Sequence, residues 1–461
     1  MTMEKRESLA TSLGFLLVSA GCAVGLGNVW RFPFVVGQNG GALFVLLYIV
    51  FLLIFGLPMM TAEFAIGRAA KRSLATAYPK LAANPGVFRS ISKFQVAGNW
   101  LLMMYYTTVA GWMLAYPVAI LSGWFSFEAP KDFFDAFVSS GSAQFLWMGL
   151  VSLIGFGVCA LGLEKGVENV TKKMMALLFL ILIGLCVYVL TLPGAGAGVS
   201  FYLKPSLSVL HGPQARPLFN IVLDALGQSF FTLSLGIGSM SIFGSYTSRK
   251  YTLAGESAKI IGIDTIVALL SGLVIFPACF AFGTQPDQGP KLIFITLPQV
   301  FAKMGAVGSW IGAVFFTFLA LAALTTVIAV FENIVAMTME KRQCTRHGAI
   351  RRNAPLLVLL SLPCAFGFGI LKWIQPMGAN TTILDLEDFV VSNLALPLGS
   401  LAILIFCVSR RYWGWEKFLQ EANAGRGLRL SGKLRWYITW VLPGVMIFVF
   451  VAALLDKFGL L

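Results

Sequence analysis

Long apolar runs recur along almost the whole chain and are separated by short polar segments. Eleven of these runs are long enough to cross a bilayer as a helix, since a spanning helix needs about 20 mostly apolar residues. They lie at 10–35, 42–66, 95–121, 144–161, 170–192, 220–244, 258–282, 309–338, 353–372, 387–408 and 436–456. The pattern predicts an all-α polytopic membrane protein with eleven transmembrane helices in one domain, residues 1–461.

Two of the predicted helices, the first and the sixth, are interrupted by residues that a spanning helix normally avoids. The first interruption holds Gly25, Gly27, Asn28 and Arg31, and the second holds Thr232, Ser234, Gly236 and Gly238. Non-helical backbone at membrane depth is tolerated only where it faces protein, a cavity or a ligand. Because the breaks lie five helices apart, they indicate a 5+5 inverted repeat over 10–192 and 220–408, with an additional helix at 436–456. Close glycine packing between helices is the alternative, but it leaves Asn28 and Arg31 unexplained.

The composition supports a membrane protein, because 58% of the residues are hydrophobic and 12% are charged. With the N-terminus placed in the cytoplasm, 26 of the 34 basic residues fall on the cytoplasmic side, as the positive-inside rule requires. The C-terminus then lies outside, and the expected location is a bacterial inner (plasma) membrane. This topology accounts for the net charge of +14, so no nucleic-acid partner is expected.

The polar residues inside the predicted spans are suited to binding ions. Half-helix amides at a break attract an anionic group and freed carbonyls attract cations, so one place can hold a zwitterion. Thr325 and Thr326 offer hydroxyl oxygens of the kind that alkali ions bind, although such threonines often bond their own helix. Asp264 is a carboxylate within a span and requires a cation or a proton. No paired carboxylates or nucleophile and base occur in the spans, which argues against an enzyme.

These residues stand in recognisable motifs. The stretch AVGLGNVWRFPF at 23–34, NGG at 39–41, QSFFTLSLGIGS at 228–239 and LTT at 324–326 resemble the neurotransmitter:sodium symporter family, especially its bacterial amino-acid transporters. The similarity extends from about residue 6 to 408. The resemblance implies sodium-coupled symport of neutral, hydrophobic L-amino acids into the cell by alternating access, with sodium, the amino acid and the lipid bilayer as partners.

The resemblance also implies the site residues. Two sodium ions are expected, the first at Ala23, Asn28, Thr232 and Asp264, and the second at Gly21, Val24, Ala322, Thr325 and Thr326. The implied substrate residues are Ala23, Leu26, Gly27, Leu102, Tyr106, Phe231, Thr232, Ser234, Ile237, Thr326 and Val330. Arg31 and Asp388 look like an extracellular gate, and Arg6 and Glu340 like a cytoplasmic one.

Three departures from the family pattern refine these expectations. Monoamine-transporting relatives have an aspartate where this chain has Gly25, so the glycine favours a substrate that brings its own carboxylate. Chloride-dependent relatives have a serine at Ala268, and here Asp264 lies one turn away to supply the negative charge, so chloride is not expected to be required. Some bacterial relatives have a proline ten residues after the counterpart of Gly166 that permits helix unwinding, whereas this chain has Ala176.

Two alternatives remain at this stage. A proton-coupled carrier would use Asp264 or Glu332 as the titrating group. The second predicted ion site, with bare carbonyls beside two hydroxyls, needs no protonatable ligand and favours sodium over a proton. A membrane sensor that binds an amino acid without moving it would not need two gates. The sequence implies neither a particular amino acid nor an oligomeric state.

Overall fold

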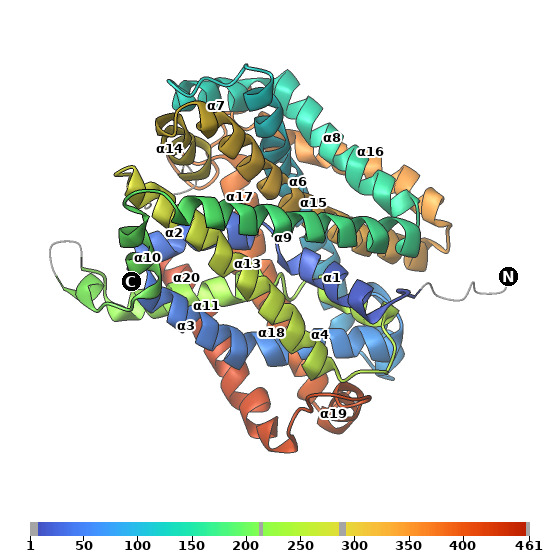
Figure 1. Ribbon diagram of the computed structural model, residues 1–461. Coiled ribbons are helices and arrows are strands. Elements are labelled where there is room, and N and C mark those ends of the chain that lie inside the picture. Colours follow the sequence, from blue (N-terminus) through green and yellow to red (C-terminus); the bar gives the residue numbers. More distant parts are fainter. Residues whose placement is uncertain (1–7, 212–214, 285–291, 458–461) are drawn as a thin grey trace.

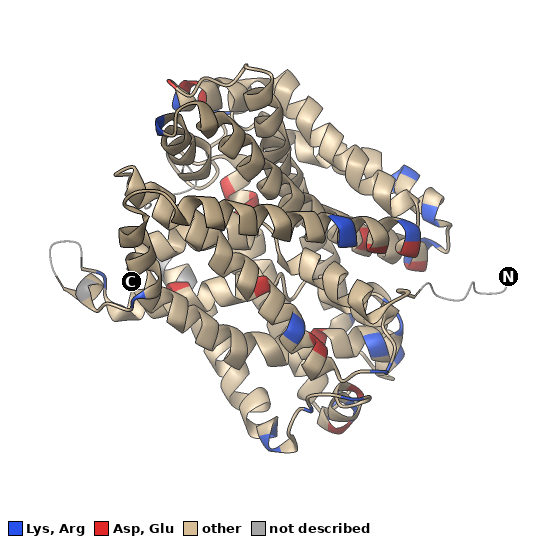
Figure 2. Cartoon of the chain, in the orientation of Figure 1, with Lys and Arg blue, Asp and Glu red and all other residues tan. Residues whose placement is uncertain are grey.

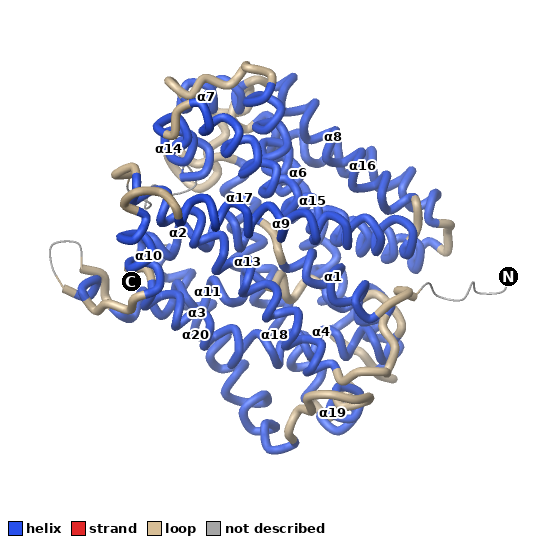
Figure 3. Tube along the Cα trace, viewed as in Figure 1, coloured by secondary structure: helices blue, strands red, loops and turns tan. Residues whose placement is uncertain are grey.

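Helices form where the apolar runs predicted them. The computed structural model describes residues 8–211, 215–284 and 292–457, and Figure 1 shows these residues as a bundle of helices. Within the described ranges no strand forms, and one isolated bridge joins Tyr251 to Arg426. Figure 3 shows helices connected by short loops. The prediction of an all-α polytopic protein is confirmed.

The first half of the chain begins with two helical segments that flank a break and continues through the long α6 and α9. Its elements are α1 (Ser12–Ala23), η1 (Gly27–Arg31), α2 (Phe32–Gln38), α3 (Ala42–Phe51), η2 (Leu52–Gly56), α4 (Leu57–Ala70), α5 (Leu74–Leu81), α6 (Phe88–Leu121), α7 (Pro130–Ser139), α8 (Gly141–Ala160), η3 (Leu163–Glu168), α9 (Asn169–Leu190), α10 (Ala195–Leu203) and η4 (Ser208–Leu210).

The second half contains the other interrupted helix and the longest helix, α15. Its elements are α11 (Leu218–Thr232), α12 (Ser239–Tyr246), α13 (Leu253–Ala281), η5 (Leu292–Thr296), α14 (Leu297–Lys303), α15 (Ala306–Arg342), α16 (Arg346–Phe366), α17 (Ile383–Phe389), η6 (Val390–Ala395), α18 (Leu396–Val408), α19 (Trp415–Ala422), η7 (Gly432–Leu434), η8 (Tyr437–Val441) and α20 (Leu442–Lys457).

Each of the eleven predicted runs overlaps a helix or consecutive helical segments. In the described part of the chain, eight helices are long and apolar enough to cross a membrane, or nine if the bent pair Ser12–Ala23 and Gly27–Gln38 counts as one span. The two other runs are occupied by α6 and by the pair α11 and α12. The figure of eleven spans stays a prediction.

The first interruption is a bend of 53° between α1 and the segment Gly27–Gln38. The helical pattern ends at Val24, whose backbone is extended with φ −68° and ψ 97°. The chain then enters η1, a short π-helix, before regular α-helix resumes at Phe32. The glycines and Asn28 therefore lie where the backbone leaves the α-helical hydrogen-bond ladder.

The second interruption lies between the end of α11 at Thr232 and the start of α12 at Ser239. Gly236 and Gly238 have φ of +103° and +91°, a left-handed conformation that glycine adopts without steric cost. At Gly236 a Cβ would lie 2.2 Å from the backbone oxygen of Leu396, so no side chain fits there. Glycine is required here by both conformation and close packing.

Buried side chains satisfy the backbone groups that this second break frees. The carboxylate of Glu63 in α4 accepts hydrogen bonds from the amides of Gly236, Met240 and Ser241 at 2.8, 3.1 and 3.4 Å. From α6, Gln95 donates to the carbonyl of Gly236 at 2.9 Å. Backbone N–H and C=O groups that leave the helical ladder away from water need other hydrogen-bond partners, and these side chains provide them.

The helices differ in how much of their surface the protein covers. In the most apolar stretch of α15, 83% of the residues are buried, against 17% for the segment Gly432–Ala452. A helix that is apolar on all sides must be buried in protein or face lipid. We conclude that the protein surrounds α15 on most sides and covers the last helical segment much less.

Charged side chains are unevenly placed along the bundle. Figure 2 shows that most lysines and arginines lie toward the end of the bundle where the described chain begins, near the ends of α4, α9, α15 and α16. The expected positive-inside distribution would make this the cytoplasmic end. The orientation itself stays a prediction.

Replacing Glu63 with Ala should destabilise the protein, because three buried amides lose their acceptor. A buried donor without a partner costs about 1–3 kcal/mol. The thermal unfolding midpoint of the purified protein in detergent should therefore fall clearly. Glu416→Ala is the matched control, since that side chain is 80% exposed and should leave the midpoint unchanged. A Glu63→Ala midpoint equal to that of the wild type would contradict the role of this carboxylate.

Candidate functional site

The two interrupted helices face each other around a small internal cavity. It measures about 20 Å³, room for one water-sized group. Its lining includes nine of the predicted substrate residues, namely Ala23, Leu26, Gly27, Leu102, Tyr106, Phe231, Thr232, Ser234 and Thr326. Gly25, which the sequence analysis connected with the substrate carboxylate, also lines it, as do Tyr105 and Leu396, which were not predicted. Residues from five distant parts of the chain therefore meet at one place.

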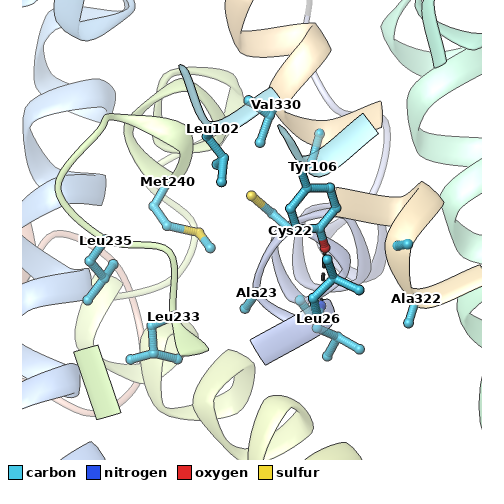
Figure 4. Packing of buried hydrophobic residues seen from close by; sticks show 14 of the residues in the cluster. Cys22, Ala23, Leu26, Leu102, Tyr106, Leu233, Leu235, Met240, Ala322 and Val330 are labelled. Atoms are coloured by element: carbon cyan, nitrogen blue, oxygen red, sulfur yellow. Dashed lines mark hydrogen bonds between the residues drawn. The ribbon is translucent and has the colours of Figure 1, made fainter. Parts of the chain in front are cut away.

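The other two predicted pocket residues are buried but do not line this cavity. Ile237 is fully buried, and its carbonyl accepts a hydrogen bond of 2.6 Å from Asn99. Val330 in α15 is also fully buried, and Figure 4 labels it. Their contribution to substrate binding stays a prediction.

One end of the cavity is arranged to receive an anionic group. The Leu26 amide, at the start of η1, donates to the Tyr106 hydroxyl oxygen at 3.1 Å, and Figure 4 shows the Tyr106 side chain reaching from α6 to this amide. Amides at a helix start attract anions. A Cβ on Gly25 would lie only 2.5 Å from the Tyr106 hydroxyl and 2.6 Å from the Thr326 hydroxyl. Glycine at position 25 therefore keeps this end open.

Three of the four residues predicted for the first sodium site, Asn28, Thr232 and Asp264, form one buried cluster. Asn28 donates to the Asp264 carboxylate at 2.9 Å, and the Thr232 hydroxyl donates to the other carboxylate oxygen at 3.2 Å. Asp264 is fully buried, and no lysine or arginine in the described ranges pairs with it. Since an unpaired buried carboxylate is costly, the cluster suits a cation.

The residues predicted for the second sodium site also converge. The Thr326 hydroxyl in α15 lies 3.3 Å from the carbonyl oxygens of both Gly21 and Val24 in the first interrupted helix, and 3.5 Å from that of Ala322. The Thr325 hydroxyl bonds the Ala322 carbonyl at 2.9 Å. Thr326 thus reaches across to another helix, and the two hydroxyls and three carbonyls offer the hard oxygen ligands that an alkali ion binds.

Each of the two predicted outer gate residues contacts a residue that lines the cavity, but the two do not form an ion pair with each other in this structure. The guanidinium of Arg31 stands 4.4 Å from the ring centre of Phe231. Asp388 accepts hydrogen bonds from Tyr105 at 3.0 Å and Ser392 at 2.8 Å. No contact of 4 Å or less joins Arg31 to Asp388 among the ion pairs of the described chain. The gate pair stays a prediction.

Of the predicted inner gate, Arg6 lies outside the described residues. Glu340, near the end of α15, accepts hydrogen bonds from the Ser73 amide at 3.0 Å, the Ser73 hydroxyl at 2.6 Å and the Thr76 hydroxyl at 2.5 Å. The carboxylate therefore holds the start of α5 against α15. Pairing between Arg6 and Glu340 stays a prediction.

A short π-helix directly precedes the fifth predicted span, 170–192. Gly166 lies within η3, a short π-helix, and Ala176 lies in the regular α9 that follows. Short π-helical segments occur frequently at functional sites.

Sequence reasoning missed the residues that connect the two breaks. Gln228 in α11 donates to the carbonyl of Gly27 at 2.9 Å, and Glu63 and Asn99 hold the other break. Each is a long polar side chain within an apolar run, and this feature of the sequence could have identified them.

Glu332, named for the proton alternative, binds Arg346 at 2.5 Å and Tyr246 at 2.8 Å. Its charge is already balanced within the protein.

Comparison with known proteins agrees with this geometry. The sodium:neurotransmitter symporter family matches residues 6–136 and 135–458. The uncharacterized sodium-dependent transporter YhdH of Bacillus subtilis is 34% identical, over 98% of each chain, and the bovine sodium- and chloride-dependent taurine transporter is 29% identical over 66% of this chain. The crystal structure of MhsT in complex with L-phenylalanine is similar with a TM-score of 0.85 and 35% identity, covering 97% of this chain and 100% of MhsT. The chain therefore belongs to the sodium:neurotransmitter symporter family and is a sodium-dependent, multi-pass membrane transporter rather than an enzyme.

Proposed function

We propose that the protein is a symporter that couples sodium to the uptake of neutral, hydrophobic L-amino acids by alternating access. The observation that carries this proposal is the arrangement of the two breaks. The Leu26 amide and the Tyr106 hydroxyl, suited to a carboxylate, lie beside the buried cluster of Asn28, Thr232 and Asp264, suited to a cation. A zwitterionic substrate and an ion would therefore stabilise each other's binding.

The lining of the cavity supports a neutral, hydrophobic side chain. Leu102, Phe231 and Leu396 line it, and none of its lining residues carries a charge. The similar transporter MhsT binds L-phenylalanine. Since the cavity measures about 20 Å³, an amino acid can enter only when the helices around it separate. We propose that the region of Arg31, Phe231 and Asp388 opens to admit it.

The proposed topology has eleven spans in a bacterial inner membrane, with the N-terminus in the cytoplasm and the C-terminus outside. The two repeats comprise residues 10–192 and 220–408, and the interrupted helices occupy matching positions in them. The gathering of basic side chains at one end of the bundle supports this orientation (Figure 2).

We propose two sodium sites. The Thr326 hydroxyl and the carbonyls of Gly21 and Val24 would hold one ion between α15 and the first interrupted helix. Asp264 would balance the charge of the other. A proton-coupled carrier would have to use Asp264, because Glu332 is already paired with Arg346.

Uptake into proteoliposomes tests the proposed function. An inward sodium gradient should drive accumulation of labelled L-phenylalanine or L-leucine, and replacing sodium with potassium should abolish it. A proton gradient in the absence of sodium should not drive accumulation of the amino acid. Binding of the amino acid without accumulation would show instead that the protein is a sensor.

The second sodium site predicts the effect of removing one hydroxyl. Thr325→Val and Thr326→Val each remove one oxygen and preserve the side-chain shape, and should weaken sodium binding by about 1–3 kcal/mol. Sodium titration of amino-acid binding measures the change. Thr317→Val is the matched control, since Thr317 in α15 bonds only the Ala313 carbonyl of its own helix. Wild-type sodium affinity in both site variants would refute the assignment.

The outer gate predicts that uptake depends on both charges. Asp388→Asn should slow uptake, because closure would leave Arg31 without its counter-charge in a place of low dielectric constant. Exchanging the two charges, Arg31→Asp with Asp388→Arg, should restore part of the rate. Asp132→Asn, an exposed change in α7, serves as the control. Normal uptake by Asp388→Asn would mean that the two residues do not act as a gate.

The carboxylate of Asp264 predicts transport that does not need chloride. Replacing chloride with gluconate should leave wild-type uptake unchanged, since the fixed charge already balances sodium. The double change Asp264→Asn with Ala268→Ser should make uptake depend on chloride, while Ala268→Ser alone should not. Loss of wild-type uptake in gluconate would show that the role given to Asp264 is wrong.

A further inference from the structure

A second cavity, separate from the transport site, opens where α15 ends and α16 begins. It has a volume of about 420 Å³ and lies between α6, α15 and α16, within the size range of ligand pockets. Lys341 lies on its rim and is 15 residues from Thr326 along α15, a distance of about 22 Å in a helix. The cavity is therefore distinct from the sodium sites.

The rim of this cavity is strongly basic. Lys341 and Arg342 from α15 and Arg352 from α16 line it. Lys93, one turn before the lining residue Val96 in α6, is close enough to repel the charge of Lys341. None of these four cations forms a hydrogen bond or ion pair with another described residue. Unbalanced charge of one sign at a concave surface attracts ions of the opposite sign.

The cavity also has an apolar part. Val96, Trp100, Met337 and Leu356 line it together with the cations. Leu356 is 45% exposed, and on the following turn of α16 Leu359 is 61% exposed. The apolar surface therefore continues from the cavity along the outside of α16. Trp100 from α6 also lines the cavity, and tryptophan is favoured at membrane interfaces.

A polar contact fixes the shape of the cavity between α15 and α16. The Asn353 amide donates to the Thr338 hydroxyl at 3.0 Å, and both residues line the cavity. Asn353 is buried, so this contact holds the helices at a defined separation beside the basic rim. The cavity is thus formed by packed helices and not by a loop.

We propose that this cavity binds the headgroup of an anionic phospholipid, with an acyl chain lying along Leu356 and Leu359. A phosphate group would meet Lys341, Arg342 and Arg352. A small soluble anion would use the cations but would leave the adjoining apolar surface unoccupied, whereas a phospholipid matches both. Basic pockets between spanning helices at the cytoplasmic side are suited to such headgroups. This site does not depend on which substrate is transported.

Native mass spectrometry of the full-length protein in detergent tests the proposal. The wild type is incubated with phosphatidylglycerol or with phosphatidylcholine. It should retain phosphatidylglycerol at a lower lipid concentration than it needs to retain phosphatidylcholine. The double change Lys341→Gln with Arg352→Gln should weaken phosphatidylglycerol binding about 30-fold, since each basic residue near a membrane surface contributes about a factor of five. Phosphatidylcholine binding should not change.

Arg351→Gln is the matched control, because Arg351 is exposed on α16 next to Arg352 but does not line the cavity. It should bind phosphatidylglycerol as the wild type does. Glycerol 3-phosphate tests for a soluble phosphate ligand, and it should not displace the lipid at equal concentration. Equal retention of both lipids by the wild type, an unchanged double variant or displacement by glycerol 3-phosphate would overturn the proposal. Sodium-dependent thermal stabilisation of each variant verifies that it is folded.

Discussion

The backbone groups freed at the two helix breaks must find hydrogen-bond partners away from water, and the rest of the structure depends on this constraint. Glu63 accepts three amides of the second break. Gln228 reaches from the second interrupted helix to the carbonyl of Gly27 in the first. Because these partners come from buried side chains, the breaks are fixed features of the fold. They hold the Leu26 amide and the carbonyls of Gly21 and Val24 where ligands can be bound.

Two buried carboxylates, Glu332 and Asp264, differ in whether a basic side chain balances their charge. Glu332 is paired with Arg346 and hydrogen-bonded to Tyr246, so its charge is balanced within the protein. Asp264 receives hydrogen bonds from Asn28 and Thr232 but has no basic partner in the described chain. Hydrogen bonds alone do not offset the cost of a buried charge. The first carboxylate therefore has a structural role, whereas the charge of the second is not balanced by any described basic side chain.

The long helix α15 connects several of these features. Thr325 and Thr326 face the first interrupted helix, Glu332 binds Arg346 of α16, and Glu340 holds the start of α5. Its last turn contributes Lys341 and Arg342 to the basic cavity. Since a helix moves largely as one body, a displacement of α15 beside the first interrupted helix would be transmitted along its whole length. The transport site and the end of the bundle with most basic residues thus share one rigid element.

The sequence by itself determined the helical class, the positions of the helices and the existence of the two breaks, because apolar runs and their interruptions are local features. The motifs also indicated Asn28, Thr232, Asp264, Thr325 and Thr326, which the structure brings together in two clusters. Only the tertiary structure decided that Glu63 and Gln228 support the breaks and that Arg346 neutralises Glu332. Nothing local specifies these partners, because each contact joins residues brought together only by the packing of different helices.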